Sequence, residues 1–484
     1  MSNSVLFPSR ADRERWDDRL TRALAQAHDE VAAGAVTPTF DRDAFRRELA
    51  AHDFASPRAF DDVAEWTIAQ LQHGVVHMTH PRYFGLFNPC PTYPAQAADR
   101  IVATFNPQLA SAVTSPAAVA IEAHVISAIA RRAGLPPGSA GHFTSGGSEA
   151  NCTALICALT GADAGFAEHG ARAFTGPPAF YVSRDSHLAW VKIAHQAGIG
   201  RAAARMVATD GAGRMDPRAL AAMIADDRAA GRVPVMIAAT AGTTNAGMID
   251  PLEACHRIAT ESKLWFHVDA AWAGALVVSD RLRGALSGIE HADSITIDAH
   301  KWLATTMGCG MFITRHAPAL TEAFHVTASF MPPNNAPGWS AGGAQDNSFS
   351  QDPYVTSLQW SRRFLGLRLF MGLAAAGWDG YAAHVERAVA SAARIAELLS
   401  ARGWRVVNRS PAAVLCLEPP SGLGEARSIV TRVVASGQAW VSVAAFEGRD
   451  IVRVCVTHGE TAPQDIATLV EALNAPGVAG PGHG

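Results

Sequence analysis

The most chemically suggestive side chain in this sequence is Lys301, which follows the β-rich run 294–298 and His300. A lysine that directly follows such a run, with Trp302 behind it, is expected to be sheltered inside the protein. A sheltered lysine amine can form a Schiff base with an aldehyde. Because most lysines are solvated surface residues, this interpretation needs support from other residues.

A second candidate is Asp269, which ends the apolar run 265–269. An isolated acid at a strand end usually caps a helix. The aldehyde cofactor pyridoxal phosphate, however, needs a carboxylate facing its ring nitrogen, so that the ring stays protonated and can take up electrons. An Asp placed one strand before Lys301 matches this requirement.

The segment 143–151 reads Phe-Thr-Ser-Gly-Gly-Ser-Glu-Ala-Asn and predicts a strand that turns into a helix. Gly147 and Ser148 at the turn let backbone N–H groups approach an anion, and a helix N-terminus favours negative charge. The segment has neither a Walker lysine nor the Gly-x-Gly-x-x-Gly of dinucleotide sites. It indicates a site for a small phosphate monoester or a plain helix cap.

Two further segments could contact a flat cofactor. His187 follows the apolar run 180–183, where an imidazole can stack on a ring, although a single His at a strand end is more often structural. Thr244 lies in the Gly-Thr-Thr run 242–244, whose small hydroxyl residues can pass under such a ring.

Along the chain, the order is the 143–151 segment, His187, the Gly-Thr-Thr run, Asp269 and the His-Lys pair. In that order, the five segments resemble the group II pyridoxal-phosphate decarboxylases of fold type I. That group includes the aromatic amino-acid, histidine, glutamate and diaminobutyrate decarboxylases. The resemblance runs from about His80 to Arg363, and the Gln-Trp-Ser-Arg-Arg run 359–363 is typical of the decarboxylase branch. It implies pyridoxal 5'-phosphate (PLP) as cofactor, no metal, and a homodimer in which a lid loop crosses to the partner subunit.

The resemblance also implies roles for individual residues. Catalytic roles are expected for Lys301, His187, Asp269 and Phe330. Contacts with the cofactor are expected from Gly147, Ser148, His187, Thr244, Asp269, His300 and Lys301. Contacts with the substrate are expected from Phe84, Phe87 and Asn88.

The implied reaction converts an L-amino acid, with aromatic side chains favoured, into its amine and carbon dioxide through a Lys301 Schiff base and a quinonoid. In the aromatic amino-acid decarboxylases a lid Tyr helps to deliver the last proton, and an ungapped count from Lys301 places Phe330 there. Phe has no proton to give, as in the plant aldehyde synthases. Oxidation to an aldehyde with ammonia and hydrogen peroxide is therefore an alternative, and a PLP transaminase is a second one.

Three other features are ambiguous. Arg453 on a late strand can bind a substrate carboxylate or pair with a surface acid. Asp298 takes a place where some family members present an amide to the phosphate; a carboxylate beside a dianion is unfavourable, so Asp298 is not predicted as a phosphate ligand. His73, His77 and His80 fall at helical spacing, but no nearby carboxylate or thiol completes a metal site, and none is expected.

Composition sets the broad class. The 484 residues are 49% hydrophobic and 17% charged, which is typical of a compact globular protein with a large core. A net charge of −4 gives no general attraction to nucleic acid or anionic membranes. The seven cysteines are scattered without a Cys-x-x-Cys pair, which suits reduced thiols. With no apolar leader or membrane-length run, we expect a cytoplasmic protein.

Periodicity predicts an α/β fold of type I. Residues 9–33 form an amphipathic helix, and residues 1–85 a helical N-terminal segment. Strands near 142–145, 179–183, 204–209, 234–240, 265–269, 294–298 and 310–314 alternate with helices, which predicts a mainly parallel seven-stranded sheet. Residues 86–352 form the large domain, with a lid loop at 325–352. Residues 353–484, helical from 354 to about 401, form a small α+β C-terminal domain. Ligands are expected at the carboxyl ends of the strands.

Overall fold

The computed structural model describes residues 5–327 and 352–476, and its centre is a seven-stranded sheet in the order β1-β7-β6-β5-β4-β2-β3. The strands are β1 (Ala140–Thr144), β2 (Pro178–Ser183), β3 (Ala204–Val207), β4 (Val233–Thr240), β5 (Trp265–Asp269), β6 (Ser294–Asp298) and β7 (Gly310–Thr314). Only β7 runs antiparallel to its neighbours. The predicted α/β fold with a mainly parallel sheet is confirmed.

Helices bury both faces of this sheet. Because successive strand residues point to opposite faces, Phe180 and Val182 pack with α6, α8 and α11, whereas Tyr181 packs on the other side with α5, α9 and α10. The helices are α5 (Pro116–Arg132), α6 (Gly147–Ala162), α8 (Ala189–Gln196), α9 (Pro217–Ala229), α10 (Leu252–Ser262) and α11 (Ala317–Phe324). Short helices connect them: α7 (Phe166–His169), η1 (Gly170–Ala173), η2 (Arg201–Ala203), η3 (Ala273–Val278), η4 (Arg283–Leu286) and η5 (Ile289–His291).

The C-terminal part contains a second, antiparallel sheet in the order β10-β11-β9-β8. Its elements are η7 (Pro353–Val355), α12 (Leu367–Ser400), β8 (Arg405–Val406), β9 (Val414–Glu418), α13 (Ala426–Ala435), β10 (Ser442–Phe446), β11 (Arg449–Cys455) and α14 (Pro463–Asn474). The two sheets fall on opposite sides of residue 353, and we propose a domain boundary there.

The long helix expected from residue 354 begins only at Leu367. Before that point the chain is held by a buried carboxylate. Glu122 on α5 pairs with Arg362 at 2.9 Å and accepts the backbone N–H groups of Leu365 and Gly366. Backbone donors that are bound to a side chain cannot also form a helical ladder, so the segment stays irregular.

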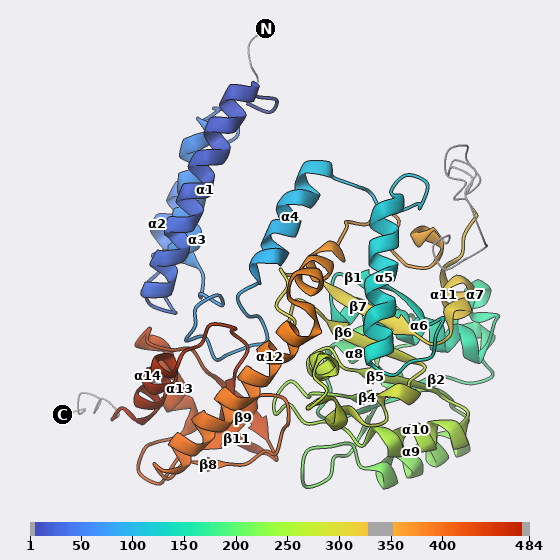
Figure 1. Ribbon diagram of the computed structural model, residues 1–484. Coiled ribbons are helices and arrows are strands. Elements are labelled where there is room, and N and C mark those ends of the chain that lie inside the picture. The colour runs from blue at the N-terminus through green and yellow to red at the C-terminus, as the bar shows by residue number, and fades with distance from the viewer. Residues whose placement is uncertain (1–4, 328–351, 477–484) are drawn as a thin grey trace.

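The N-terminal helices stand away from the rest of the chain (Figure 1). They are α1 (Arg10–Ala33), α2 (Arg42–Ala50) and α3 (Phe60–Gly74), and none of them contains a buried residue. The predicted first helix is confirmed. Next, α4 (Tyr93–Phe105) packs against α12. Among the helices of the two described ranges, none has the length and apolarity needed to span a bilayer.

Candidate active site

A cavity of about 300 Å³ lies at the carboxyl ends of the central strands, where Thr240, Asp269 and Asp298 are the last residues of β4, β5 and β6. This is the edge at which the sequence places a ligand. The residues predicted from sequence that line the cavity are Phe87, Gly147, Ser148, His187, Thr244, Asp269, His300 and Lys301.

The other predicted residues lie elsewhere. Phe84 is buried in the main hydrophobic cluster, and Asn88 donates from its amide to the Met307 sulfur, so neither lines the cavity. Phe330 lies outside the described residues.

Asp269 is a buried carboxylate whose two oxygens both accept hydrogen bonds. Asn151 on α6 donates to Oδ2 at 2.8 Å, and the backbone N–H of Ala271 donates to Oδ1 at 3.2 Å. The side chain is therefore fixed in orientation before any ligand arrives. A fixed carboxylate at the cavity wall can hold a proton on a ring nitrogen.

Lys301 faces the same cavity from the turn after β6. Its Nζ lies 3.0 Å from Oδ2 of Asp298, and its side chain is 22% exposed. The other oxygen of Asp298, Oδ1, is buried without a hydrogen-bond partner. Among the chain's three lysines, only Lys301 lies at the cavity; Lys192 and Lys263 are exposed.

The N-terminus of α6 forms the wall beside Asp298. A Cβ on Gly147 would lie 2.9 Å from Oδ2 of Asp298 and 3.2 Å from Cβ of Ala271, so only glycine fits without displacing its neighbours. The first N–H groups of a helix have no partner within it, and the helix dipole favours an anion there. Ser145 and Glu149 bond to each other at the rim of this wall.

His187 lies on another wall of the cavity. Its Nδ1 accepts the backbone N–H of Ala189 at 3.1 Å, which leaves the ring hydrogen on Nε2. Although the residue is open to the cavity, loss of surrounding water lowers the pKa of its imidazole, while the nearby Asp269 carboxylate acts in the opposite direction. A neutral ring is thus presented at neutral pH.

These residues fit PLP. A lysine amine suits its aldehyde, a fixed carboxylate suits its ring nitrogen, and the glycine-bearing helix end suits its phosphate. The single feature that does not match simple phosphate binding is the Asp298 carboxylate beside that helix end.

Arg453 does not pair with a surface acid, which was one of the two roles expected from sequence. It is buried and forms no ion pair with any described acid. Its guanidinium donates to the carbonyl oxygens of Thr244 and Gly85 and lies 4.7 Å from the centre of the Phe87 ring. Arg453 therefore supports two residues of the cavity wall, Thr244 and Phe87, from behind.

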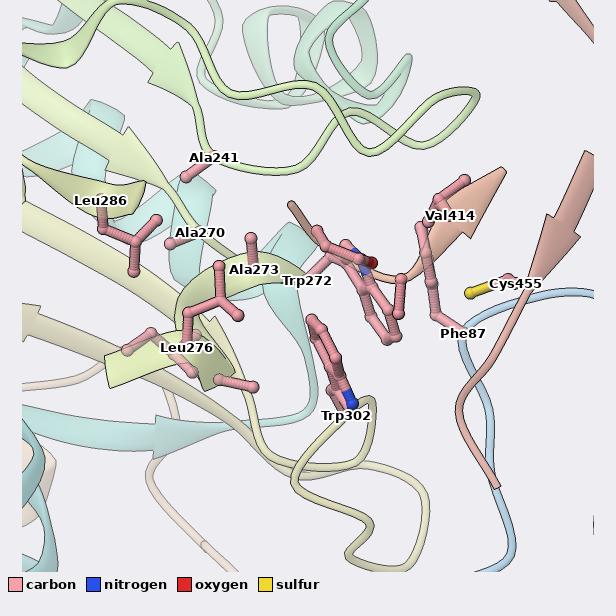
Figure 2. Packing of buried hydrophobic residues seen from close by; sticks show 14 of the residues in the cluster. Phe87, Ala241, Ala270, Trp272, Ala273, Leu276, Leu286, Trp302, Val414 and Cys455 are labelled. Atoms are coloured by element: carbon pink, nitrogen blue, oxygen red, sulfur yellow. The ribbon is translucent and has the colours of Figure 1, made fainter. Parts of the chain in front are cut away.

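Trp272 and Asn151 are among the wall residues that were not predicted from sequence. Trp272 stacks on Phe87 at 4.2 Å and on Trp302 at 4.6 Å, and Figure 2 shows the side chains of Trp272 and Trp302 next to each other. Asn151 lies one helical turn after Gly147, on the side of α6 that meets Asp269. The sequence signal for this residue was an Asn one helical turn after Gly147, because a buried amide needs polar partners.

Comparison with known proteins agrees with this site. The pyridoxal-dependent decarboxylase conserved domain matches residues 46–415. L-2,4-diaminobutyrate decarboxylase from Rhizobium meliloti (strain 1021) is 30% identical over 418 residues, covering 83% of this chain and 79% of that protein. Phenylacetaldehyde synthase from Arabidopsis thaliana is 26% identical over 422 residues, covering 83% and 82%.

Among solved structures, that of Oryza sativa TDC with PLP and tryptamine matches with a TM-score of 0.87 and 24% identity. The match covers 96% of this chain and 97% of that chain, which shows a shared fold. The chain therefore belongs to the pyridoxal-dependent decarboxylase family and is a PLP-dependent carboxy-lyase of amino acids.

Proposed function

We propose that the protein converts an L-amino acid with a flat, apolar side chain into its amine and carbon dioxide. The observation that carries this proposal is the convergence of Lys301, Asp269 and the N-terminus of α6 on one cavity. Each comes from a different element, and together they match the three functional groups of PLP.

The chain's own residues divide the work. Bound PLP supplies an electron sink for the bond to the leaving carboxylate. Lys301 provides the amine that holds the cofactor aldehyde, and Asp269 holds a proton at the ring nitrogen. Gly147 and Ser148 would hold the phosphate through their backbone N–H groups, and the neutral His187 ring would contact the cofactor ring.

The proposed substrate class rests on the aromatic wall. Phe87 and Trp272 are stacked and buried, and both line the cavity. A flat side chain gains offset stacking against such a wall, at about 0.5–1.5 kcal/mol beyond its burial.

A panel of L-amino acids tests the proposal. Purified protein with PLP is assayed for carbon dioxide, amine and peroxide together. We expect aromatic amino acids to give carbon dioxide and amine, with the highest kcat/KM in the panel. A preference for 2,4-diaminobutyrate would contradict the substrate class, and formation of the keto acid without carbon dioxide would contradict decarboxylation.

Oxidation is a second candidate outcome, and Phe330 favours it. Without a hydroxyl at that position, Cα is protonated more slowly and has time to react with oxygen. One oxygen and one water would then be consumed per amino acid, giving the aldehyde, carbon dioxide, ammonia and hydrogen peroxide. The relative named phenylacetaldehyde synthase supports this candidate.

Phe330→Tyr tests the oxidative outcome. General acid catalysis by a placed hydroxyl is typically worth about 100- to 10,000-fold, so the variant should yield more amine and less peroxide than the wild type in air. Phe54→Tyr, which adds the same hydroxyl to an exposed ring, is the control. Clean amine production by the wild type in air, unchanged in the variant, would contradict this assignment.

We also propose a cytoplasmic homodimer. Apolar side chains that are exposed in one chain support association: Phe7, Tyr93, Phe105, Met307 and Leu358. The seven cysteines are all free thiols, as suits a reducing compartment. Light scattering coupled to size exclusion should give twice the chain mass, and a monomer would contradict the dimer.

A further inference from the structure

Behind Asp269, a chain of buried side chains leads away from the cavity. Asn151 donates from Nδ2 to Oδ2 of Asp269 at 2.8 Å, and its Oδ1 lies 3.1 Å from Nε2 of His267. On the other side of the ring, Nδ1 of His267 lies 2.8 Å from Oγ of Ser294, which in turn receives Nε1–H of Trp265 at 2.8 Å. The contacts join α6, β5 and β6.

These contacts form a relay that runs from Asp269 through Asn151, His267 and Ser294 to Trp265. The donor and the acceptor of each hydrogen bond in the relay are determined. An ionised carboxylate only accepts, so the Asn151 atom that faces Asp269 is the NH₂ group. The amide oxygen of Asn151 therefore faces His267, and the hydrogen of the ring is on Nε2. Nδ1 then accepts the Ser294 hydroxyl hydrogen, because Trp265 can only donate to Ser294.

His267 can join Asn151 to Ser294 in this way because its ring stays neutral. It is fully buried, with 0% exposure, and burial lowers the pKa of its imidazole to about 4, against an opposing effect of the Asp269 charge. A charged ring would donate from both nitrogens and reverse the bond to Ser294. The hydrogen on Nε2 keeps Asn151 in one orientation, with its NH₂ toward Asp269.

We propose that Asn151 and His267 are positioning residues that keep Asp269 oriented and weakly basic, so that the shared proton stays on the ring nitrogen of the cofactor. The inference rests on the proposed function, in which Asp269 faces that nitrogen. A hydrogen bond to a carboxylate stabilises its ionised form. Without the donor on Oδ2, the carboxylate attracts the proton more strongly and the ring nitrogen loses it.

The test uses protein loaded with PLP that carries ¹⁵N in the ring. The nitrogen signal in NMR reports directly whether the ring is protonated, and kcat and KM are measured on the same samples. Asn151→Leu, which keeps the side-chain volume and removes both amide contacts, should shift the signal toward the unprotonated position. By analogy with the residues that orient metal ligands, kcat should fall about 10- to 100-fold with KM little changed.

His267 is tested with a matched pair. His267→Phe keeps a ring and removes both nitrogens, so it should shift the signal as Asn151→Leu does. His267→Gln can still donate to Asn151 and should retain most of the wild-type signal and rate. Because the two residues act in series, the double variant Asn151→Leu/His267→Phe should be no worse than the single variants.

Tyr181→Phe is the control for a general loss of buried polar contacts. It removes a hydrogen bond from Tyr181 on β2 to Asp227 on α9, and neither residue lines the cavity, so the signal should not move. Should Asn151→Leu not fold, Asn151→Ser takes its place, since a serine hydroxyl is too short to reach both partners.

Two failures can be told apart. If Asp269→Asn shifts the ring signal and the relay variants do not, the relay proposal is overturned, even if their activity falls. If Asp269→Asn also leaves the signal unmoved, Asp269 does not face the ring nitrogen, and the proposed placement of the cofactor fails with it.

Discussion

The two ends of the cavity are each built on an aspartate that ends a strand, yet their surroundings differ. At one end, both oxygens of Asp269 accept hydrogen bonds from Asn151 and Ala271. At the other end, Oδ2 of Asp298 pairs with Lys301, and Oδ1 is buried without a hydrogen-bond partner. The two residues are the last residues of the adjacent strands β5 and β6.

The comparison shows that hydrogen-bond partners, more than position, distinguish the two acids. The Asp269 end is complete without a ligand and is held rigidly by the protein. The Asp298 end is incomplete, since a buried carboxylate oxygen without a donor costs free energy. Asp298 and its neighbours are therefore expected to adjust when the cofactor arrives, whereas Asp269 is not.

The largest effect is expected at Lys301. Lys301→Ala should abolish turnover and the visible absorption of the bound cofactor, because Lys192 and Lys263 are exposed and do not line the cavity. Borohydride reduction of the wild type followed by peptide mass spectrometry should label Lys301 alone. Lys263→Ala is the control and should behave as wild type. A labelled and active Lys301→Ala protein would refute the site itself.

At the complete end, Asp269→Asn should leave a folded protein that still takes up PLP. A neutral amide cannot hold the ring nitrogen protonated, and the loss of one preorganised electrostatic contact typically lowers kcat about 100- to 1,000-fold. Steady-state kinetics at saturating PLP measure this. Near-normal kcat would mean that Asp269 is a structural strand-end residue and that the difference between the two ends has no catalytic meaning.

At the incomplete end, Asp298→Asn should strengthen binding of a phosphate. Removing one like charge next to a phosphate is worth about 1 kcal/mol or more, which corresponds to roughly tenfold in Kd. Pyridoxamine 5'-phosphate is the suitable ligand, because it binds without forming a bond to Lys301, and fluorescence titration gives its Kd.

Pyridoxamine without the phosphate is the matched control ligand for Asp298→Asn. Its Kd should not change, since it brings no negative charge to the N-terminus of α6. An equal gain for both ligands would show that Asp298 acts on the ring or on folding. No gain for either would show that the phosphate binds away from Asp298.

The strands of the large sheet could be predicted from sequence because short apolar runs alternate with helical segments along the chain. Asp269, Gly147 and Lys301 were selected for the same reason, since each lies at the end of such a run or shortly after it. The start of α12 could not be predicted, because it depends on Glu122, which is more than 200 residues away in the sequence.

The remaining parts of the site also depend on contacts between distant segments. The partner of Asn151 lies 118 residues further along the chain, and Arg453 reaches Gly85 across 368 residues. Phe84 and Asn88 were predicted for the substrate pocket together with Phe87, but neighbouring residues of an irregular segment point in different directions. Only Phe87 reaches the cavity wall.

The smallest expected effect is a loss of folding stability in acid, and it arises from His267, behind the Asp269 end of the cavity. His267 has its pKa lowered from 6.5 to about 4 by burial. A histidine with a lowered folded-state pKa contributes stability that is fully present above pH 6.5 and is lost as the pH falls toward about 4, because the unfolded chain takes up the proton first. The shift corresponds to about 3 kcal/mol at most.

His267→Gln should remove this contribution. The free energy of unfolding of the wild type, measured by urea titration, should fall more steeply between pH 6.5 and 4.5 than that of the variant. His80 and His142, whose pKa values are also lowered by burial, to about 4 and about 3, remain in both proteins, so the slope should be reduced without vanishing. Parallel pH profiles for the two proteins would mean that His267 is charged in the folded state. The bond between Nδ1 of His267 and Ser294 would then be reversed, whereas Nε2 would still donate to Asn151.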